Sequence, residues 1–240
     1  MTDRILGVLG GMGPLASAHF MLRLTLLTPA EHDQDHVPAI LWSDPRIPGR
    51  VAARLGTGPD PLPWLLHAIA GLKQAGCGAI AIPCNTVHGW YDQMAKSAGV
   101  PILHIVDAAA TDLKRAGLSG GRIGLMATQT TLDMKLYQDR LGARGWEIIA
   151  PEPAKMHHLV NPAIEAIKAN RIADAYAPLA EVANSLAARG ANAVVLGCTE
   201  IPLGLEAGAV EVPIIDTIDA LARAAIGWFR GGGDEDQDSP

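Results

Sequence analysis

The sequence predicts an α/β fold made of two pseudo-symmetric lobes, each a mainly parallel sheet flanked by helices. Short apolar runs alternate with helix-like stretches along the 240 residues, as consecutive β–α units require. The strand-to-loop junction around Leu9 has a counterpart around Leu125, and the loop around Cys84 has one around Cys198. Because these pairs recur at nearly equal spacing, they indicate a duplicated half-chain.

The first half contains the start and stop signals of two helices. Pro14 suits the first turn of a helix that ends before Pro29, because proline lacks an N–H that a helix start leaves unpaired. Asp60 and Pro61 provide the N-cap and first turn of another helix, which ends at Gly76. The predicted strands of this half are Ile5–Leu9, Val37–Trp42, Ala79–Ile82 and Ile102–Val106.

The second half repeats the alternation. Its predicted strands are Arg122–Ala127, Glu147–Ala150, Ala193–Leu196 and Val212–Ile215. Its predicted helices are one that contains Leu132, Leu136 and Leu141, followed by Pro162–Ala169, Ala173–Ala188 and Ile218–Phe229. We expect residues 1–107 to form the first lobe, completed by 211–230, and residues 108–210 to form the second. The glycine-rich and then acidic stretch 231–240 is expected to be a disordered tail.

Composition narrows the class of protein. A formal net charge of −6 argues against nucleic acid as a partner, since phosphate backbones bind basic surfaces. No apolar run is long enough to cross a membrane, and the first residues lack the profile of a signal peptide. The three cysteines suit a reducing compartment rather than a disulfide framework. A cytoplasmic protein is therefore expected.

Cys84 and Cys198 are the candidate reactive groups. Each follows an apolar run and precedes a probable helix start, and ligands of parallel α/β sheets collect at that edge. A helix start lowers the pKa of a thiol. A single free cysteine is commonly a small core residue, as we expect for Cys77, but two at equivalent strand ends favour two thiols facing one cleft. A thiol redox pair is the alternative, although no Cys-x-x-Cys spacing is present.

The loop Gly10-Gly-Met-Gly-Pro14 connects the first strand to its helix. It formally satisfies the dinucleotide fingerprint, but the acidic residues Glu31, Asp33 and Asp35 precede the second strand instead of following it. We therefore interpret the loop as a cradle for a small carboxylate.

Arg50, in a proline-rigid loop after the second strand, is the candidate clamp for a carboxylate, with Arg46 as its competitor. The eight histidines show no metal-ligand spacing, so neither a metal nor another cofactor is expected. His88 is expected either to start a helix or to line the site.

Taken together, six motifs in order resemble the aspartate/glutamate racemase family over about residues 5–228. They are Gly10-Gly-Met-Gly-Pro14, Asp33-Gln-Asp-His36, Ile47-Pro-Gly-Arg50, Cys84-Asn-Thr-Val-His88, Ala127-Thr-Gln-Thr-Thr131 and Gly197-Cys-Thr-Glu200. The resemblance implies a cofactor-independent amino-acid racemase, a homodimer, with Cys84 and Cys198 as its acid and base. It also implies the substrate-binding residues, which are Met12, Arg50, Asn85, Thr86, Val87, Thr128, Lys168, Thr199 and Glu200.

Two departures leave the substrate open between acidic and neutral amino acids. Gly49 stands where the family usually has Asp before the Arg, and Thr130 stands where it has Gly. Lys168 corresponds to a lysine of the aspartate-specific members, whose accompanying tyrosine is missing from this helix. Two other functions stay possible: an isomerase or hydantoin-type racemase that uses the same cysteines, and a non-catalytic binder of small acids or dinucleotides.

Overall fold

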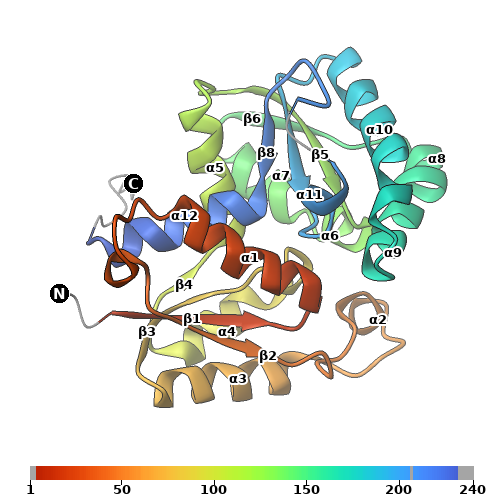
Figure 1. Ribbon diagram of the computed structural model, residues 1–240. Coiled ribbons are helices and arrows are strands. Elements are labelled where there is room, and N and C mark those ends of the chain that lie inside the picture. Colours follow the sequence, from red (N-terminus) through yellow and green to blue (C-terminus); the bar gives the residue numbers. More distant parts are fainter. Residues whose placement is uncertain (1–3, 206–207, 232–240) are drawn as a thin grey trace.

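Two parallel four-stranded sheets form the framework of the protein (Figure 1). The computed structural model describes residues 4–205 and 208–231, so the tail predicted over 231–240 lies almost entirely outside the described residues. The first sheet has the order β2-β1-β3-β4 and the second has the order β6-β5-β7-β8. The two sheets therefore repeat one topology, as the duplicated sequence pattern predicts.

The strands of the first sheet are β1 (Ile5–Gly10), β2 (Ala39–Ser43), β3 (Cys77–Ala81) and β4 (Ile102–Leu103). Those of the second are β5 (Gly121–Ala127), β6 (Trp146–Ile149), β7 (Ala193–Gly197) and β8 (Ile214–Asp216). The strands β1, β3, β5 and β7 in the middle of the sheets are mostly buried apolar runs, because helices cover both faces, whereas the edge strand β2 is only partly buried.

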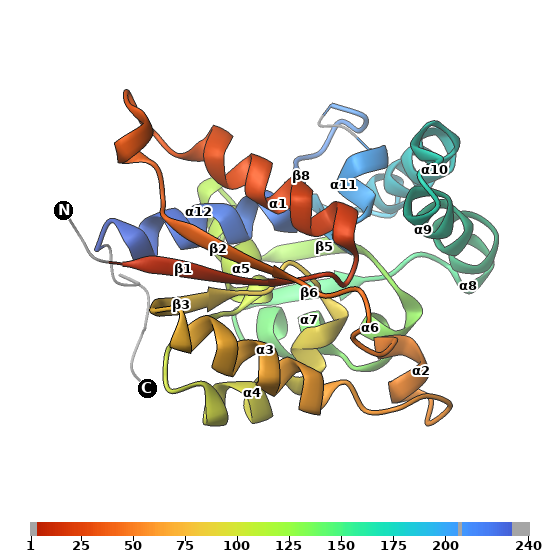
Figure 2. The same ribbon diagram turned by 60° about the horizontal axis from the view of Figure 1, so that its bottom comes forward.

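The helices of the first half are α1 (Pro14–Leu27), α2 (Arg50–Arg54), α3 (Leu62–Gln74), α4 (Tyr91–Ala98) and α5 (Ile105–Arg115), with short 3₁₀ turns η1 (Asp33–Asp35) and η2 (Thr86–Trp90). The second half has α6 (Gln129–Asp133), α7 (Leu136–Gly142), α8 (Pro153–Lys155), α9 (Asn161–Lys168), α10 (Tyr176–Ala188), α11 (Ile201–Gly204) and α12 (Thr217–Phe229), with a π turn η3 (Met156–Val160) and a 3₁₀ turn η4 (Ile172–Ala175). Figure 2 shows α3 and α4 on one face of the first sheet and α1 and α12 on the other.

The last helix of each half packs beyond its own sheet. After β8 of the second sheet, α12 runs along α1 and also contacts β1 and β4 of the first sheet (Figure 1). After β4 of the first sheet, α5 packs against α12, α7 and β8. Apolar side chains of both helices, such as Leu113 and Leu221, join one core with Leu6 of β1 and Leu125 of β5. The two lobes are therefore interlocked by an exchange of helices.

Three details of the sequence prediction are wrong. The stretch 211–230 is expected to complete the first lobe, but its strand β8 pairs with β7 and belongs to the second sheet. Within this stretch it is α12 that contacts the first lobe. The strand predicted over Ile102–Val106 ends at Leu103, because the His104 side chain accepts a hydrogen bond from the Val106 N–H and starts α5. The helix predicted through Leu141 is divided in two at Lys135, whose φ of 54° is left-handed.

Candidate active site

The two cysteines of the sequence prediction line one cavity. Cys198 directly follows β7, and Cys84 follows β3 after a short turn in which its N–H donates to the Ile82 carbonyl over 2.8 Å. Both side chains are almost fully buried, yet both border the same cavity of about 470 Å³. The arrangement agrees with the expectation that equivalent strand ends bring the two thiols to a shared cleft.

Nearly all the predicted binding residues border this cavity. Those that do are Met12, Arg50, Asn85, Thr86, Thr128, Lys168, Thr199 and Glu200. Val87 does not, because it is fully buried in the apolar core of the first lobe beside Leu9 and Leu65. His88 is buried as well and does not border the cavity. Residues of the wall that the sequence analysis did not single out are Val51, Ala52, Leu55, Thr57 and Glu165, and Gly49, where the sequence departs from the family, also borders the cavity.

Cys198 is paired with a carboxylate. Its Sγ donates to Oε2 of Glu200 over 3.1 Å, and the Thr199 hydroxyl donates to the same oxygen over 3.3 Å. Burial, followed by the negative charge of Glu200, raises the pKa of Cys198 well above its ordinary value. Cys198 is therefore a protonated thiol near neutral pH.

Asn85 of the first lobe forms hydrogen bonds with two residues of the second half of the chain. Its Oδ1 accepts the phenolic proton of Tyr137 over 2.5 Å, and its Nδ2 donates to the Thr217 hydroxyl over 3.2 Å. Thr217 in turn donates to the carbonyl of Leu196, two residues before Cys198. These bonds hold the loops of both cysteines in one network.

Three threonine hydroxyls gather at the wall between the lobes. Oγ1 of Thr86 lies 2.9 Å from that of Thr131 and 3.3 Å from that of Thr128, and the latter two are 3.0 Å apart. Thr128 is also the N-cap of α6, where its hydroxyl accepts from the Thr131 N–H. A hydroxyl can rotate to donate or accept, so this cluster is suited to hydrogen-bonding a carboxylate.

Arg50 presents a guanidinium group that is held by carbonyl oxygens. It donates to the carbonyls of Met12 at 3.0 Å, Pro48 at 3.2 Å and Ile47 at 3.5 Å, and its Nε is buried without a partner. Among the described residues it has no carboxylate partner. The competing candidate Arg46 is exposed, pairs with Asp44 over 2.9 Å and does not border the cavity.

Lys168 reaches the cavity from the end of α9. Its ammonium group donates to Glu165 over 2.8 Å. Burial lowers the pKa of Lys168, but the bond to Glu165 and the charges of Glu165 and Glu200 outweigh this, so the net shift is upward. The lysine is therefore a permanent cation that faces the Cys198 side of the cavity.

The glycine-rich loop has part of the geometry of the predicted cradle. Gly11 has a φ of 90° and packs so closely on the Asp44 backbone that a Cβ would collide with it. The Gly11 N–H, however, donates to the Ser17 hydroxyl over 2.9 Å and is occupied. The loop brings Met12 to the cavity wall.

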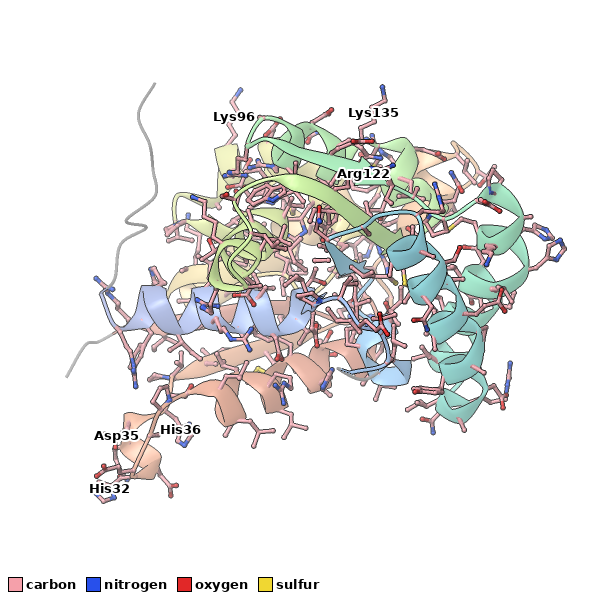
Figure 3. The ribbon with its side chains drawn as sticks, turned by 90° about the horizontal axis from the view of Figure 1, so that it is seen from above. His32, Asp35, His36, Lys96, Arg122 and Lys135 are labelled. Atoms are coloured by element: carbon pink, nitrogen blue, oxygen red, sulfur yellow. The ribbon has the colours of Figure 1, made fainter. Side chains whose placement is uncertain are left out.

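The acidic segment after α1 does not contribute to the cavity. Figure 3 shows Asp35 and its neighbours His32 and His36 on a segment that projects from the body of the protein. The described residues contain no group of three histidine, cysteine, aspartate or glutamate side chains placed to hold a metal ion. Across the described ranges, none of the helices combines the length and apolarity needed to cross a bilayer.

The comparison with protein families agrees with this geometry. The family model for Asp/Glu/Hydantoin racemase matches residues 9–225, a range that contains both cysteine loops. The chain belongs to the Asp/Glu/Hydantoin racemase family. An aspartate racemase of Picrophilus torridus superposes with a TM-score of 0.85 at 30% identity and covers 95% of each chain. A putative Asp/Glu racemase of Yersinia pestis gives a TM-score of 0.77 at 28% identity, covering 95% of this chain and 99% of its own.

The chain is also similar to racemases whose names indicate other substrates. The broad specificity amino-acid racemase RacX of Bacillus subtilis is 25% identical over 229 residues, which cover 94% of this chain and 98% of the relative. A glutamate racemase of Francisella tularensis in complex with D-glutamate has the same fold, with a TM-score of 0.66 at 17% identity, covering 95% of this chain and 82% of its own. Racemases with different substrates therefore share this architecture.

Proposed function

We propose that this member of the racemase family interconverts the L and D enantiomers of an acidic amino acid, aspartate or glutamate, without a cofactor. Family membership and the racemases that superpose on the chain support an amino-acid racemase. The observation that carries the chemistry is the cavity shared by Cys84 and Cys198. Racemisation needs two acid/base groups, one for each face of the substrate, and two thiols from opposite lobes meet that need.

In the proposed mechanism one thiolate removes the α-proton and the opposite thiol delivers a proton to the other face. Burial and Glu200 keep Cys198 protonated, so it is proposed as the donor when Cys84 abstracts. The two cysteines exchange these roles for the other enantiomer. Because the carbanion is unstable, hydrogen-bond donors are needed at the carboxylate where negative charge develops. The hydroxyls of Thr86 and Thr128 are proposed as such donors.

The acidic substrate is proposed from the cations of the cavity. Arg50 is a guanidinium group without a carboxylate partner among the described residues, and its fork geometry suits a side-chain carboxylate. Glu200 is proposed to attract the ammonium group of the substrate. A neutral amino acid would offer Arg50 no side-chain carboxylate, which disfavours it relative to aspartate or glutamate.

The proposed function is tested with Cys84→Ser and Cys198→Ser, each assayed by circular dichroism on the enantiomers of aspartate and glutamate. Both variants should fold and lose net racemisation, because serine is far too weak an acid to replace a thiol. Exchange of the α-proton with deuterated solvent is expected to survive from one face in a single variant. Cys77→Ser is the matched control, since Cys77 is buried beneath Gly7 and does not border the cavity. Near-normal racemisation in either active-site variant would contradict the two-thiol mechanism.

Independence from a cofactor is tested on the same protein. After exhaustive chelation and without pyridoxal phosphate, the enzyme should keep its full rate. Alkylation of the thiols should inactivate it, and substrate should protect. Activity that returned only on adding a metal ion or pyridoxal phosphate would show the cofactor-free proposal to be wrong.

A further inference from the structure

His88 contacts the backbone of Cys84 from outside the cavity. Its side chain is 2% exposed, and its Nδ1 lies 2.9 Å from the Cys84 carbonyl oxygen. On the other side of the ring, Nε2 lies 3.3 Å from the backbone nitrogen of Ile105, the first residue of α5. One imidazole therefore joins the Cys84 loop to the start of the helix that crosses to the second lobe.

The contact with Cys84 favours one tautomer of His88. A carbonyl oxygen only accepts hydrogen bonds, so Nδ1 carries the proton that is donated to Cys84. In the neutral ring Nε2 is then bare and accepts from the Ile105 N–H, with the Leu103 carbonyl also beside the ring. Burial, partly offset by the carbonyls of Cys84 and Leu103, lowers the pKa of His88 to about 4, which agrees with a neutral ring near neutral pH.

The Cys84 backbone has few other restraints at this point. Its N–H donates to Ile82, and the side chain of the following Asn85 is occupied by Tyr137 and Thr217. The Cys84 carbonyl is the group that His88 holds. Holding it restrains the Cys84 backbone and therefore the direction in which the Cα–Cβ bond, which carries the thiol, leaves the chain. The same imidazole contacts the first residue of α5, and α5 packs on α7 and β8 of the second lobe. His88 therefore connects the Cys84 loop to the lobe that carries Cys198.

We propose that His88 is a positioning residue that aims the Cys84 thiol at the substrate by donating from Nδ1 to the Cys84 carbonyl, while Nε2 accepts from the Ile105 N–H. The proposal rests on the proposed function for its kinetic consequence, since a misplaced acid/base group slows proton transfer more than it weakens binding. Its structural claim, the donation to Cys84, is independent of turnover.

Two amide variants separate the nitrogens of the ring. In His88→Asn the side-chain amide reaches the place of Nδ1 and can still donate to Cys84, whereas in His88→Gln it reaches the place of Nε2 and can still meet Ile105. His104→Gln is the matched control, because His104 packs 4.8 Å from His88 and accepts from the Val106 N–H of the same helix but does not touch Cys84.

We expect His88→Gln to lower kcat about tenfold or more while KM changes less than about threefold, and His88→Asn to restore most of kcat. The alkylation rate of Cys84, measured by mass spectrometry of its peptide, should change in His88→Gln and return towards the wild-type value in His88→Asn, while that of Cys198 stays unchanged. His104→Gln should alter thermal stability without altering the reactivity of Cys84. Equal effects of the two His88 variants on kcat and Cys84 reactivity, or the same loss in His104→Gln, would overturn the proposal.

A spectroscopic measurement covers the case in which the His88 variants do not fold. In the wild-type protein labelled with ¹⁵N-histidine, the His88 ring should show a protonated Nδ1 and a bare Nε2 at neutral pH. The opposite tautomer would overturn the proposal. The alkylation and the ¹⁵N measurement need no racemase activity, so the proposed function can fail while the role of His88 is still decided.

Discussion

The phenolic oxygen of Tyr137 lies 2.5 Å from Oδ1 of Asn85, so a buried residue of α7 in the second lobe donates to the residue next to Cys84 in the first. Burial raises the pKa of Tyr137, so the phenol keeps the proton that this bond requires. The contact links the second lobe directly to the loop that carries Cys84.

Replacing Tyr137 by phenylalanine tests this contact. The buried Oδ1 of Asn85 would lose its donor, and an unsatisfied buried acceptor costs about 1–3 kcal/mol. We expect Tyr137→Phe to lower the free energy of unfolding by that amount in urea titrations and to lower kcat. Tyr176→Phe is the control, because Tyr176 is half exposed and should change neither quantity. Wild-type stability in Tyr137→Phe would contradict the bond.

Arg50 is the best test of substrate choice. If it binds a side-chain carboxylate, Arg50→Ala removes a charge-assisted contact worth about 2–5 kcal/mol, or roughly 30- to several-thousand-fold in kcat/KM. The loss should be large for aspartate or glutamate and small for neutral amino acids. Arg50→Lys should rescue only in part, because an ammonium cannot reproduce the planar fork.

The exposed Arg46 provides the matched control for Arg50, since Arg46→Ala removes the same charge from the segment just before α2, outside the cavity. It should leave kcat/KM within about threefold of wild type, as surface charges contribute little. Equal losses on acidic and neutral substrates in Arg50→Ala would assign Arg50 a structural role and would exclude the proposed clamp.

Glu200 should control the ionisation of Cys198. Its carboxylate accepts from the thiol and, after burial, is the main cause of the raised pKa of Cys198. In Glu200→Gln this negative charge is absent, so the pH at which Cys198 becomes reactive to iodoacetamide should fall. The Cys84 peptide of the same sample is the internal control, and its pH profile should stay unchanged. An upward shift at Cys198 would contradict the assignment.

Asp216 should make stability depend on pH. It caps α12 by accepting from the Ile218 and Asp219 N–H groups, yet burial and the nearby Asp219 charge raise its pKa from 3.8 to about 7. A carboxyl whose pKa is raised by folding contributes stability below pH 3.8, and that stability is lost as pH rises towards 7. Asparagine also caps helices but does not titrate.

Urea unfolding at several pH values between 4 and 8 measures this effect. Relative to Asp216→Asn, the free energy of unfolding of the wild type should fall by on the order of 1–3 kcal/mol between pH 4 and 8. This is less than the pKa shift would give if it were converted in full into free energy, because water partly screens the half-buried carboxyl. A wild-type protein that gained stability relative to the variant as pH rose would show the sign to be wrong.

Sequence reasoning found the parts of the site that depend on strand ends. Parallel strands end at one edge of a sheet, so the sequence alone predicts that Cys84 and Cys198 share one cleft. The contacts of Arg50 could not be predicted in this way, because the Met12 carbonyl that it binds lies 38 residues away in the sequence. Glu165 was not singled out either, since an exposed helical glutamate carries no distinctive pattern.

Errors arose where a side chain decided the local structure. Val87 belongs to a motif that contacts substrate in the resemblance, but the η2 turn directs it into the core of the first lobe. The apolar residues around Val106 resemble a strand until the His104 side chain is seen to cap α5. These outcomes depend on side-chain hydrogen bonds, which periodicity does not record.

The exchange of α5 and α12 bears on the origin of the molecule. A polypeptide that ended after α5 would possess α1 but lack the helix that runs along it, and its own α5 would project without α7 and β8 to pack on. If each half descends from one shorter ancestor, that ancestor closed its core by trading its last helix with a second copy, and it already placed two equivalent thiols in one cleft. Fusion of the two genes would then have freed the halves to diverge, so that the cavity now carries Arg50 from the first half and Glu200 from the second.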